Sequence, residues 1–162
     1  MEVSFRPSQI AGLASAVGAL AADQATKAVI NANSAALAGG VSLLPGFNLV
    51  YLRNDGVTFG LLAGVPWWAL ATLALGIIVW LAVLMAQAGN RLEALAYGLV
   101  IGGALGNVVD RLRFGGVTDF LDFYVRGWHW PAFNFSDIAV VSGVLLLLLQ
   151  QARVARRQKH SR

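Results

Sequence analysis

The feature that most constrains the fold of this 162-residue chain is a run from Pro66 to Ala88 that contains no charged residue. A helix needs about 20 apolar residues to cross the hydrocarbon layer of a membrane, and this run is long enough. Over the whole chain 57% of the residues are hydrophobic and 12% are charged, whereas a soluble domain has about 25% charged residues. A compact soluble fold of this length cannot bury so much apolar surface. The sequence therefore predicts an integral membrane protein.

Three other apolar segments reach spanning length only when ionisable residues are included. Asp23 and Lys27 fall in the first segment, Asp110 in the third and Asp137 in the fourth. Charged groups inside a membrane are costly and usually have partners or a function. We expect a mostly α-helical membrane protein with a single domain, 1–162, whose four transmembrane helices lie at about 10–30, 66–88, 92–110 and 136–152.

The segments between the expected spans are of two kinds. Residues 41–62 are strand-like and contain the turn signals Pro45-Gly46 and Asn54-Asp55-Gly56, so a small extracytoplasmic β-hairpin or sheet is expected there. Between the third and fourth spans lies a cluster typical of an outer loop at lipid headgroup depth, which consists of Trp128, His129, Trp130 and Phe133.

The basic residues favour a cytoplasmic location for both termini. With four spans the two termini lie on one side of the membrane, and the fourth span is followed by a basic tail of Arg153, Arg156, Arg157, Lys159 and Arg162. Basic residues are retained on the cytoplasmic side. A basic tail can also bind nucleic acid, but its place directly after an apolar run favours a membrane flank, and no nucleic-acid partner is expected.

The first apolar segment has a second interpretation as a cleavable signal peptide. A basic residue, Arg6, precedes a short apolar core and an Ala-Leu-Ala sequence, which is the order of such a peptide. However, Asp23 and Lys27 lie one helical turn apart and can form an ion pair. A helix that continues through an ion pair indicates a span that is retained.

The third span carries glycine at every fourth position: Gly98, Gly102 and Gly106. Small residues at this spacing let helix backbones approach closely. The same spacing continues to Asp110, so this helix is expected to pack at the centre and to deliver its polar end to a shared site. Packing alone also explains the glycines.

Most kinds of hydrolytic site are excluded by composition. The chain has no cysteine and two histidines, His129 and His160, so a cysteine nucleophile and the His-Glu-x-x-His zinc motif are absent. His129 stands between two tryptophans and is interpreted as an interfacial residue. A serine–lysine pair would need Lys27, which Asp23 is expected to neutralise. Paired carboxylates remain.

Asp119 and Asp137 are the candidate pair. Asp119 follows the third span and Asp137 begins the fourth, and the short connection lets them face each other. Of two carboxylates that share a site, one is protonated while the other stays ionised, which suits acid–base hydrolysis. The alternatives are a salt bridge from Asp119 to Arg111 or Arg113, and a helix-terminus role for Asp137.

Four further polar residues are candidates for binding or support. Arg111 lies one turn after Asn107 and can orient a carboxylate or a substrate carbonyl; the alternative is an Asp110–Arg111 ion pair at a helix end. Asn54 can bind a peptide backbone or can simply form a turn. Asn134 can hold a substrate or a loop, or can cap a helix.

Four sequence blocks follow one another along the chain: Asp23-Gln24-Ala25-Thr26-Lys27, Asn54-Asp55-Gly56-Val57-Thr58-Phe59-Gly60, Gly106-Asn107-Val108-Val109-Asp110-Arg111 with Val117-Thr118-Asp119-Phe120, and Phe133-Asn134-Phe135-Ser136-Asp137. Together and in this order they resemble the bacterial lipoprotein signal peptidase (signal peptidase II) family. Two residues, Thr58 and Ser136, stand where the family often has alanine.

The resemblance implies an aspartic endopeptidase of the bacterial inner membrane that cuts a diacylglyceryl-modified prolipoprotein just before its lipidated cysteine. It implies that Asp119 and Asp137 are catalytic, that Asn54, Asn107, Arg111 and Asn134 line the site, and that Asp23, Lys27, Gly56 and Asp110 support it. No metal or cofactor is expected. The expected partners are the lipidated substrate and membrane lipids, the protein is expected to be a monomer, and the active site is expected near the outer leaflet.

Two other functions use the same residues differently. A small proton-coupled transporter would relay protons through the carboxylates, but it needs a path open to both sides, and here the acids gather toward one side. A structural membrane subunit would use them only in ion pairs at helix ends.

Overall fold

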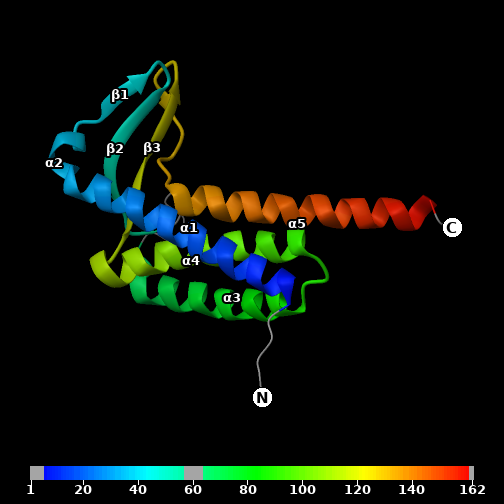
Figure 1. Cartoon of the computed structure of the whole chain (residues 1–162). Coiled ribbons are helices and arrows are strands. Elements are labelled where there is room, and N and C mark those ends of the chain that lie inside the picture. The colour runs from blue at the N-terminus through cyan, green and yellow to red at the C-terminus, as the bar shows by residue number, and fades with distance from the viewer. Residues whose placement is uncertain (1–5, 57–63, 161–162) are drawn as a thin grey trace.

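The computed structural model describes residues 6–56 and 64–160. Four long helices run side by side, and a small sheet sits at one end of them (Figure 1). The long helices are α1 (Pro7–Ala32), α3 (Trp67–Gln87), α4 (Arg91–Phe114) and α5 (Phe135–His160), and the short helix α2 (Ser34–Leu37) follows α1. The sheet lies at the end where α1 and α4 finish and where α3 and α5 begin.

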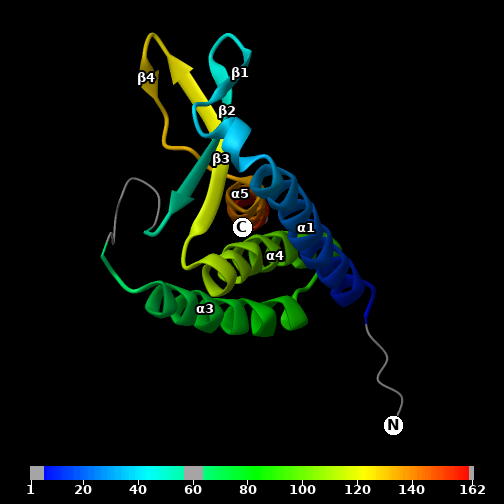
Figure 2. The same cartoon turned by 90° about the vertical axis from the view of Figure 1, so that its left-hand side faces the viewer.

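Helix α4 is the centre of the bundle, because it packs against α1, α3 and α5. It begins at a cap in which the Asn90 side chain accepts a hydrogen bond from the Glu93 backbone N–H. It ends at Gly115, whose φ of 72° is left-handed and therefore suits glycine. Figure 2 shows α4 lying between α1 and α3 with α5 seen end-on beside it.

The glycines of α4 allow this close packing. A side-chain carbon at Gly98 or Gly102 would collide with the backbone carbonyl of Gly12 or Ala16 on α1. At Gly106 it would collide with the Asp23 carboxylate and the Ser136 hydroxyl. These regularly spaced glycines therefore allow close packing, as expected, and they also bring the polar end of α4 against α1 and α5.

The sheet is antiparallel and has the strand order β1-β2-β3-β4. Strands β1 (Val41–Leu44) and β2 (Phe47–Asn54) form the hairpin expected within 41–62, of which residues 57–62 lie outside the described part. The sequence analysis did not predict β3 (Val117–Val125), which pairs with β2, or the short β4 (Trp128–His129). The pairing of β2 with β3 joins segments more than sixty residues apart, and no local signal encodes such a partner.

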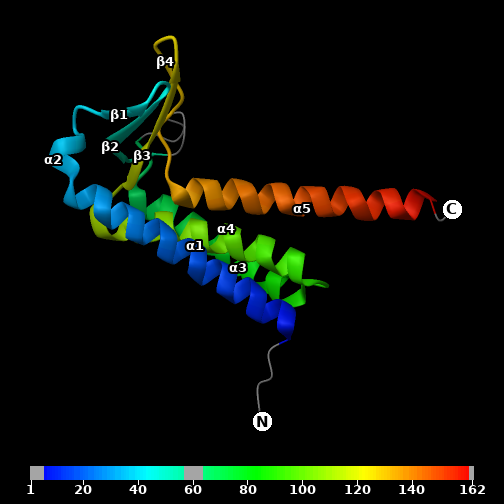
Figure 3. The same ribbon diagram turned by 45° about the horizontal axis from the view of Figure 1, so that its top comes forward.

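Among the residues that the structure describes, three helices, α3, α4 and α5, are long and apolar enough to cross a membrane. The expected first span, α1, is not among them, because polar residues such as Asp23 and Lys27 lower its mean hydropathy. Large apolar side chains are exposed along α3 and α5, including Val79 and Trp80 on α3 and Leu145 on α5. Figure 3 shows that α5 extends well past the ends of the other helices, so its helical structure continues from the apolar run into the basic tail.

Candidate active site

Asp119 lies on β3 where this strand passes over the ends of the helices. Its side chain is buried, with only 2% of the residue exposed. One carboxylate oxygen accepts a hydrogen bond from the Asn54 amide at 2.9 Å, and the other accepts from the Asn134 amide at 2.7 Å. No salt bridge from Asp119 to Arg111 or Arg113 occurs among the described residues, so that alternative is not supported.

Asp137 lies in the first turn of α5, and Asn134 caps this helix. The Asn134 side chain accepts a hydrogen bond from the Asp137 backbone N–H at 3.1 Å, and the Asn134 backbone N–H donates to the Asp137 carboxylate at 3.1 Å. This reciprocal pair is a capping box. The helix-terminus role expected as an alternative is therefore present, and it fixes the Asp137 side chain beside Asn134.

Two asparagines connect the carboxylates. Asn134 bonds both of them, Asp119 through its side chain and Asp137 through its backbone. The Asn107 amide donates to Asp137 at 3.2 Å and its oxygen accepts from Asn134 at 3.3 Å. The fold thus brings Asp119 and Asp137 into one hydrogen-bonded group.

Both carboxylates line one cavity of about 50 Å³, together with Asn54, Gly56, Asn107, Arg111 and Val117. A single water needs roughly 10–15 Å³ of such space and several polar partners. The cavity is therefore large enough for a water molecule in contact with acceptors and donors.

The Asp119 carboxyl is harder to ionise than an ordinary aspartate. Its pKa is raised from 3.8 to about 6: burial is the largest cause and the nearby Asp137 charge adds to it, whereas the hydrogen bonds from Asn54 and Asn134 act in the opposite direction. A carboxyl whose pKa lies near neutrality can both hold and release a proton under working conditions.

Arg111 directs its guanidinium into the same cavity. It donates to the carbonyl oxygens of Gly56 at 2.9 Å and Asn107 at 3.2 Å. Its Nε is buried and has no hydrogen-bond partner among the described residues. The expected alternative, an Asp110–Arg111 ion pair, is not found there: Asp110 instead accepts from the Thr118 backbone at 2.8 Å and lies 3.4 Å from Lys27.

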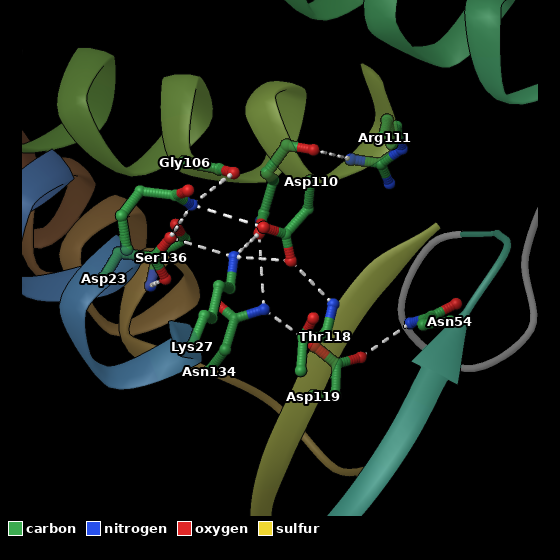
Figure 4. A network of polar contacts seen from close by, with 12 residues as sticks. Asp23, Lys27, Asn54, Gly106, Asp110, Arg111, Thr118, Asp119, Asn134 and Ser136 are labelled. Atoms are coloured by element: carbon green, nitrogen blue, oxygen red, sulfur yellow. Dashed lines mark hydrogen bonds and ion pairs between the residues drawn. The ribbon is translucent and has the colours of Figure 1, made fainter. Parts of the chain in front are cut away.

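A buried charged cluster supports these residues from α1 (Figure 4). Lys27 forms the expected ion pair with Asp23 at 2.9 Å, and its ammonium also donates to the Asn107 side-chain oxygen at 2.9 Å. Paired, hydrogen-bonded charges are tolerated in a buried place, whereas single ones are not. Helix α1 is therefore part of the site, which agrees with a retained segment rather than a removable one.

Three contributors to this cluster were not among the predicted site residues. Gln24 donates to Asp23, to the Gly106 carbonyl and to Asp110. The backbone N–H of Ser136 donates to Asp23 at 2.9 Å, and that of Thr118 donates to Asp110. Only Gln24, a polar residue in an apolar helix, left a signal that could have been used.

Of the two residues that depart from the family pattern, Ser136 and Thr58, the structure describes Ser136. The Ser136 hydroxyl is buried and has no hydrogen-bond partner among the described residues. Thr58 lies outside the described residues.

His129 is not part of the site. Its ring nitrogen lies 2.9 Å from the Asp122 carboxylate, its side chain is half exposed, and its ring stacks on Tyr124. Within 6–56 and 64–160 no group of three or more His, Cys, Asp or Glu side chains gathers as a metal site would require.

Comparison with known proteins gives consistent results. The family model described as "Signal peptidase (SPase) II" matches residues 15–153. The chain is 45% identical over 119 residues to the lipoprotein signal peptidase of Burkholderia mallei (strain SAVP1), which covers 71% of this chain and 72% of the relative. It is 48% identical over 120 residues to the lipoprotein signal peptidase of Yersinia pseudotuberculosis serotype O:1b (strain IP 31758), with 71% of each chain covered.

Two solved structures have the same fold. Both are described as a bacterial membrane enzyme determined by the in meso method, one at 2.3 Å and one at 1.9 Å resolution. The first has a TM-score of 0.80 at 27% identity and covers 94% of this chain and 93% of its own. The second has a TM-score of 0.75 at 28% identity and covers 93% and 97%.

Proposed function

The chain belongs to the signal peptidase II family, and from this premise we propose that it is the protease that removes signal peptides from prolipoproteins by aspartic chemistry. The substrate is a prolipoprotein whose cysteine carries a diacylglyceryl group, and the bond broken is the peptide bond just before that cysteine. A proton-coupled transporter or a structural subunit is not favoured, because the relatives are peptidases.

One observation carries the mechanism: Asp119 and Asp137 line the same small cavity and are held by the same asparagine. In the proposed reaction the ionised carboxylate takes a proton from a water in this cavity. The water oxygen attacks the scissile carbonyl carbon while the protonated carboxyl donates to the carbonyl oxygen. Collapse of the tetrahedral intermediate breaks the C–N bond and transfers a proton to the leaving amine. The two groups titrate as a coupled pair.

The other residues of the cavity bind the peptide. The Nε of Arg111, which has no hydrogen-bond partner in the described part of the chain, and the amide of Asn54 point to a role in holding backbone carbonyls near the scissile bond. Gly56 supports this geometry, because its carbonyl accepts from Arg111 and its N–H donates to the Asn54 side chain at 3.1 Å.

We further propose the membrane arrangement expected from the sequence. All four long helices, α1 included, span the inner membrane as a single domain of a monomer, with both termini in the cytoplasm. The charges of α1 are compatible with a span because Asp23 and Lys27 are paired against α4 rather than exposed to lipid. The site then lies near the outer leaflet, at the level of the sheet.

The test is cleavage by the purified protein of a diacylated precursor peptide and its unlipidated twin. We expect cleavage of the lipidated peptide before its cysteine, and a loss of kcat of about 10²–10⁴-fold in Asp119→Asn and in Asp137→Asn, the range that acid–base groups contribute. Asp122→Asn is the matched control, because Asp122 is a buried carboxylate on the same strand that does not line the cavity. Native rates in either dyad variant would reject the mechanism.

A further inference from the structure

A second, larger cavity adjoins the site. This α5 groove has a volume of about 340 Å³ and is lined by Trp130, Phe133, Asp137, Ile138, Val141 and Ser142. Asp137 therefore belongs to the walls of both the catalytic cavity and the groove. Whatever fills the groove lies directly beside the bond that is cut.

The groove is formed where the aromatic segment before α5 faces the first turns of that helix. Its lining is mostly apolar. Val141 is 56% exposed, and the same helix continues with exposed Leu145 and Leu148 toward its C-terminal end. The groove thus opens onto the helix surface that faces the hydrocarbon of the membrane.

Two parts of the proposed substrate are apolar and adjoin the scissile bond: the signal peptide and the acyl chains on the cysteine. A peptide must be extended to be cut, and each of its residues then presents an N–H and a C=O that need hydrogen-bond partners. The groove lining carries few hydrogen-bonding side chains, since three of its six residues are wholly apolar and only Asp137, Ser142 and the indole of Trp130 have a polar side-chain atom. An acyl chain carries no such groups, and burying it against apolar walls is favourable.

We propose that the α5 groove binds an acyl chain of the diacylglyceryl-modified cysteine, an inference that rests on the proposed function. The polar cavity with Asn54 and Arg111 binds the peptide, and the groove with Phe133, Ile138 and Val141 binds the lipid. Asp137 stands between them, so that a substrate fills both cavities only when its cysteine is lipidated. Lipid recognition thereby positions the scissile bond.

The first experiment narrows the groove. Val141→Phe fills part of it, and the matched control Val79→Phe makes the same change at an exposed valine on α3, where the exposed fraction is 65%. Each protein is assayed in the same detergent on one precursor peptide carrying long or short diacylglyceryl chains or none. We expect Val141→Phe to lower the long-to-short ratio of kcat/KM by about tenfold, the loss expected when roughly two methylene groups are displaced. Val79→Phe should keep the wild-type ratio.

The outcomes separate this inference from the proposed function. If the wild-type protein cuts none of the peptides, the proposed function fails and the inference falls with it. If the wild type cuts the lipidated peptide but Val141→Phe keeps its chain-length ratio, or Val79→Phe changes it equally, the groove does not bind the acyl chain although the function stands.

A second measurement is independent of turnover, and it also covers the case in which Val141→Phe does not fold. The Asp119→Asn protein is mixed with a precursor peptide whose acyl chains end in a photoreactive diazirine, irradiated and analysed by peptide mass spectrometry. Adducts should concentrate in the segment 130–142, which contains the groove lining. Adducts that concentrate instead on α3 or on β1 would overturn the proposal.

Discussion

At the residue scale, Asn134 has the largest number of structural roles in the site. It caps α5, bonds both carboxylates and donates to Asn107. Its side chain determines where the Asp119 carboxylate lies, and its backbone determines where the Asp137 carboxylate lies. The cap that the sequence suggested for this residue is present, and the substrate or loop contact stays a prediction.

We predict that Asn134→Ala lowers both stability and activity. Loss of an N-cap costs about 1 kcal/mol, and loss of a hydrogen bond to a charged group costs roughly 1.5–3 kcal/mol, equivalent to about 10- to 100-fold in kcat/KM. The control is Asn90→Ala, because Asn90 caps α4 in the same way but lies far from the cavity. The midpoint temperature of thermal unfolding should fall in both variants, and peptidase activity should fall only in Asn134→Ala. Equal activity in the two variants would show that Asn134 acts only as a helix cap.

The side chain of Asn54 takes part in both a turn and the site. Its side-chain oxygen accepts from the Gly56 N–H, as the turn interpretation predicted, and its amide donates to Asp119. Binding of a peptide backbone by Asn54 stays a prediction. The pKa of Asp119 is raised to about 6, with burial as the largest cause, and the hydrogen bond from Asn54 acts in the opposite direction.

Removing this donor should therefore raise the pKa of Asp119 further. In Asn54→Ala the charged carboxylate loses a stabilising bond, so the limb of the pH profile of kcat/KM that reports Asp119 should move to higher pH. The control is Asn48→Ala, since Asn48 also lies on β2 and donates to an aspartate of β3, Asp122 at 3.0 Å. An unchanged profile in Asn54→Ala, or an equal shift in Asn48→Ala, would show that Asn54 does not tune Asp119.

At the scale of elements, the contact between α1 and α4 matters most. Helix α1 delivers Asp23 and Lys27 to the cluster beneath the dyad, and it can do so only because the α4 glycines leave room for its backbone. The periodicity of these glycines was visible in the sequence, but it did not identify α1 as the partner, since any helix can fill such a stripe.

We predict that Gly102→Ala destabilises the protein by about 1–3 kcal/mol, the usual cost of overpacking. The added methyl group would meet the Ala16 carbonyl oxygen on α1. The control is Gly76→Ala in the middle of α3, where a side-chain carbon meets nothing within 4 Å. Thermal unfolding in detergent should show a lower midpoint for Gly102→Ala and an equal or higher midpoint for Gly76→Ala. A Gly102→Ala protein as stable as the wild type would show that α1 and α4 are not closely packed there.

At the scale of the whole molecule, the sheet and the site lie at one end of the helices, and the beginning of α1 and the end of α5 lie at the other (Figure 1). This arrangement fits the proposed orientation, in which the sheet is outside the cell and the termini are inside. The apolar faces of α3 and α5 then contact lipid, and the polar groups of α1 and α4 are hidden between helices.

The orientation can be tested directly because the chain contains no cysteine. Ser42→Cys places a thiol on the exposed β1 strand, and Gln87→Cys places one at the opposite end, where α3 finishes. The cells are stripped of the outer membrane while the inner membrane is kept intact. An impermeant thiol reagent should then label Ser42→Cys directly, and it should label Gln87→Cys only after the inner membrane is permeabilised. The reverse pattern would place the termini outside.

The sequence by itself determined the membrane class, the four long helices and the ion pairs between residues one helical turn apart, such as Asp23 with Lys27. These follow from apolar length and helical periodicity, which are local properties of the chain. Only the tertiary structure decided that β2 pairs with β3, that Asn134 connects Asp119 to Asp137, and that Lys27 reaches Asn107. Such contacts depend on how closely separate elements approach each other, and this distance is set by packing across the whole molecule rather than by any segment of the sequence.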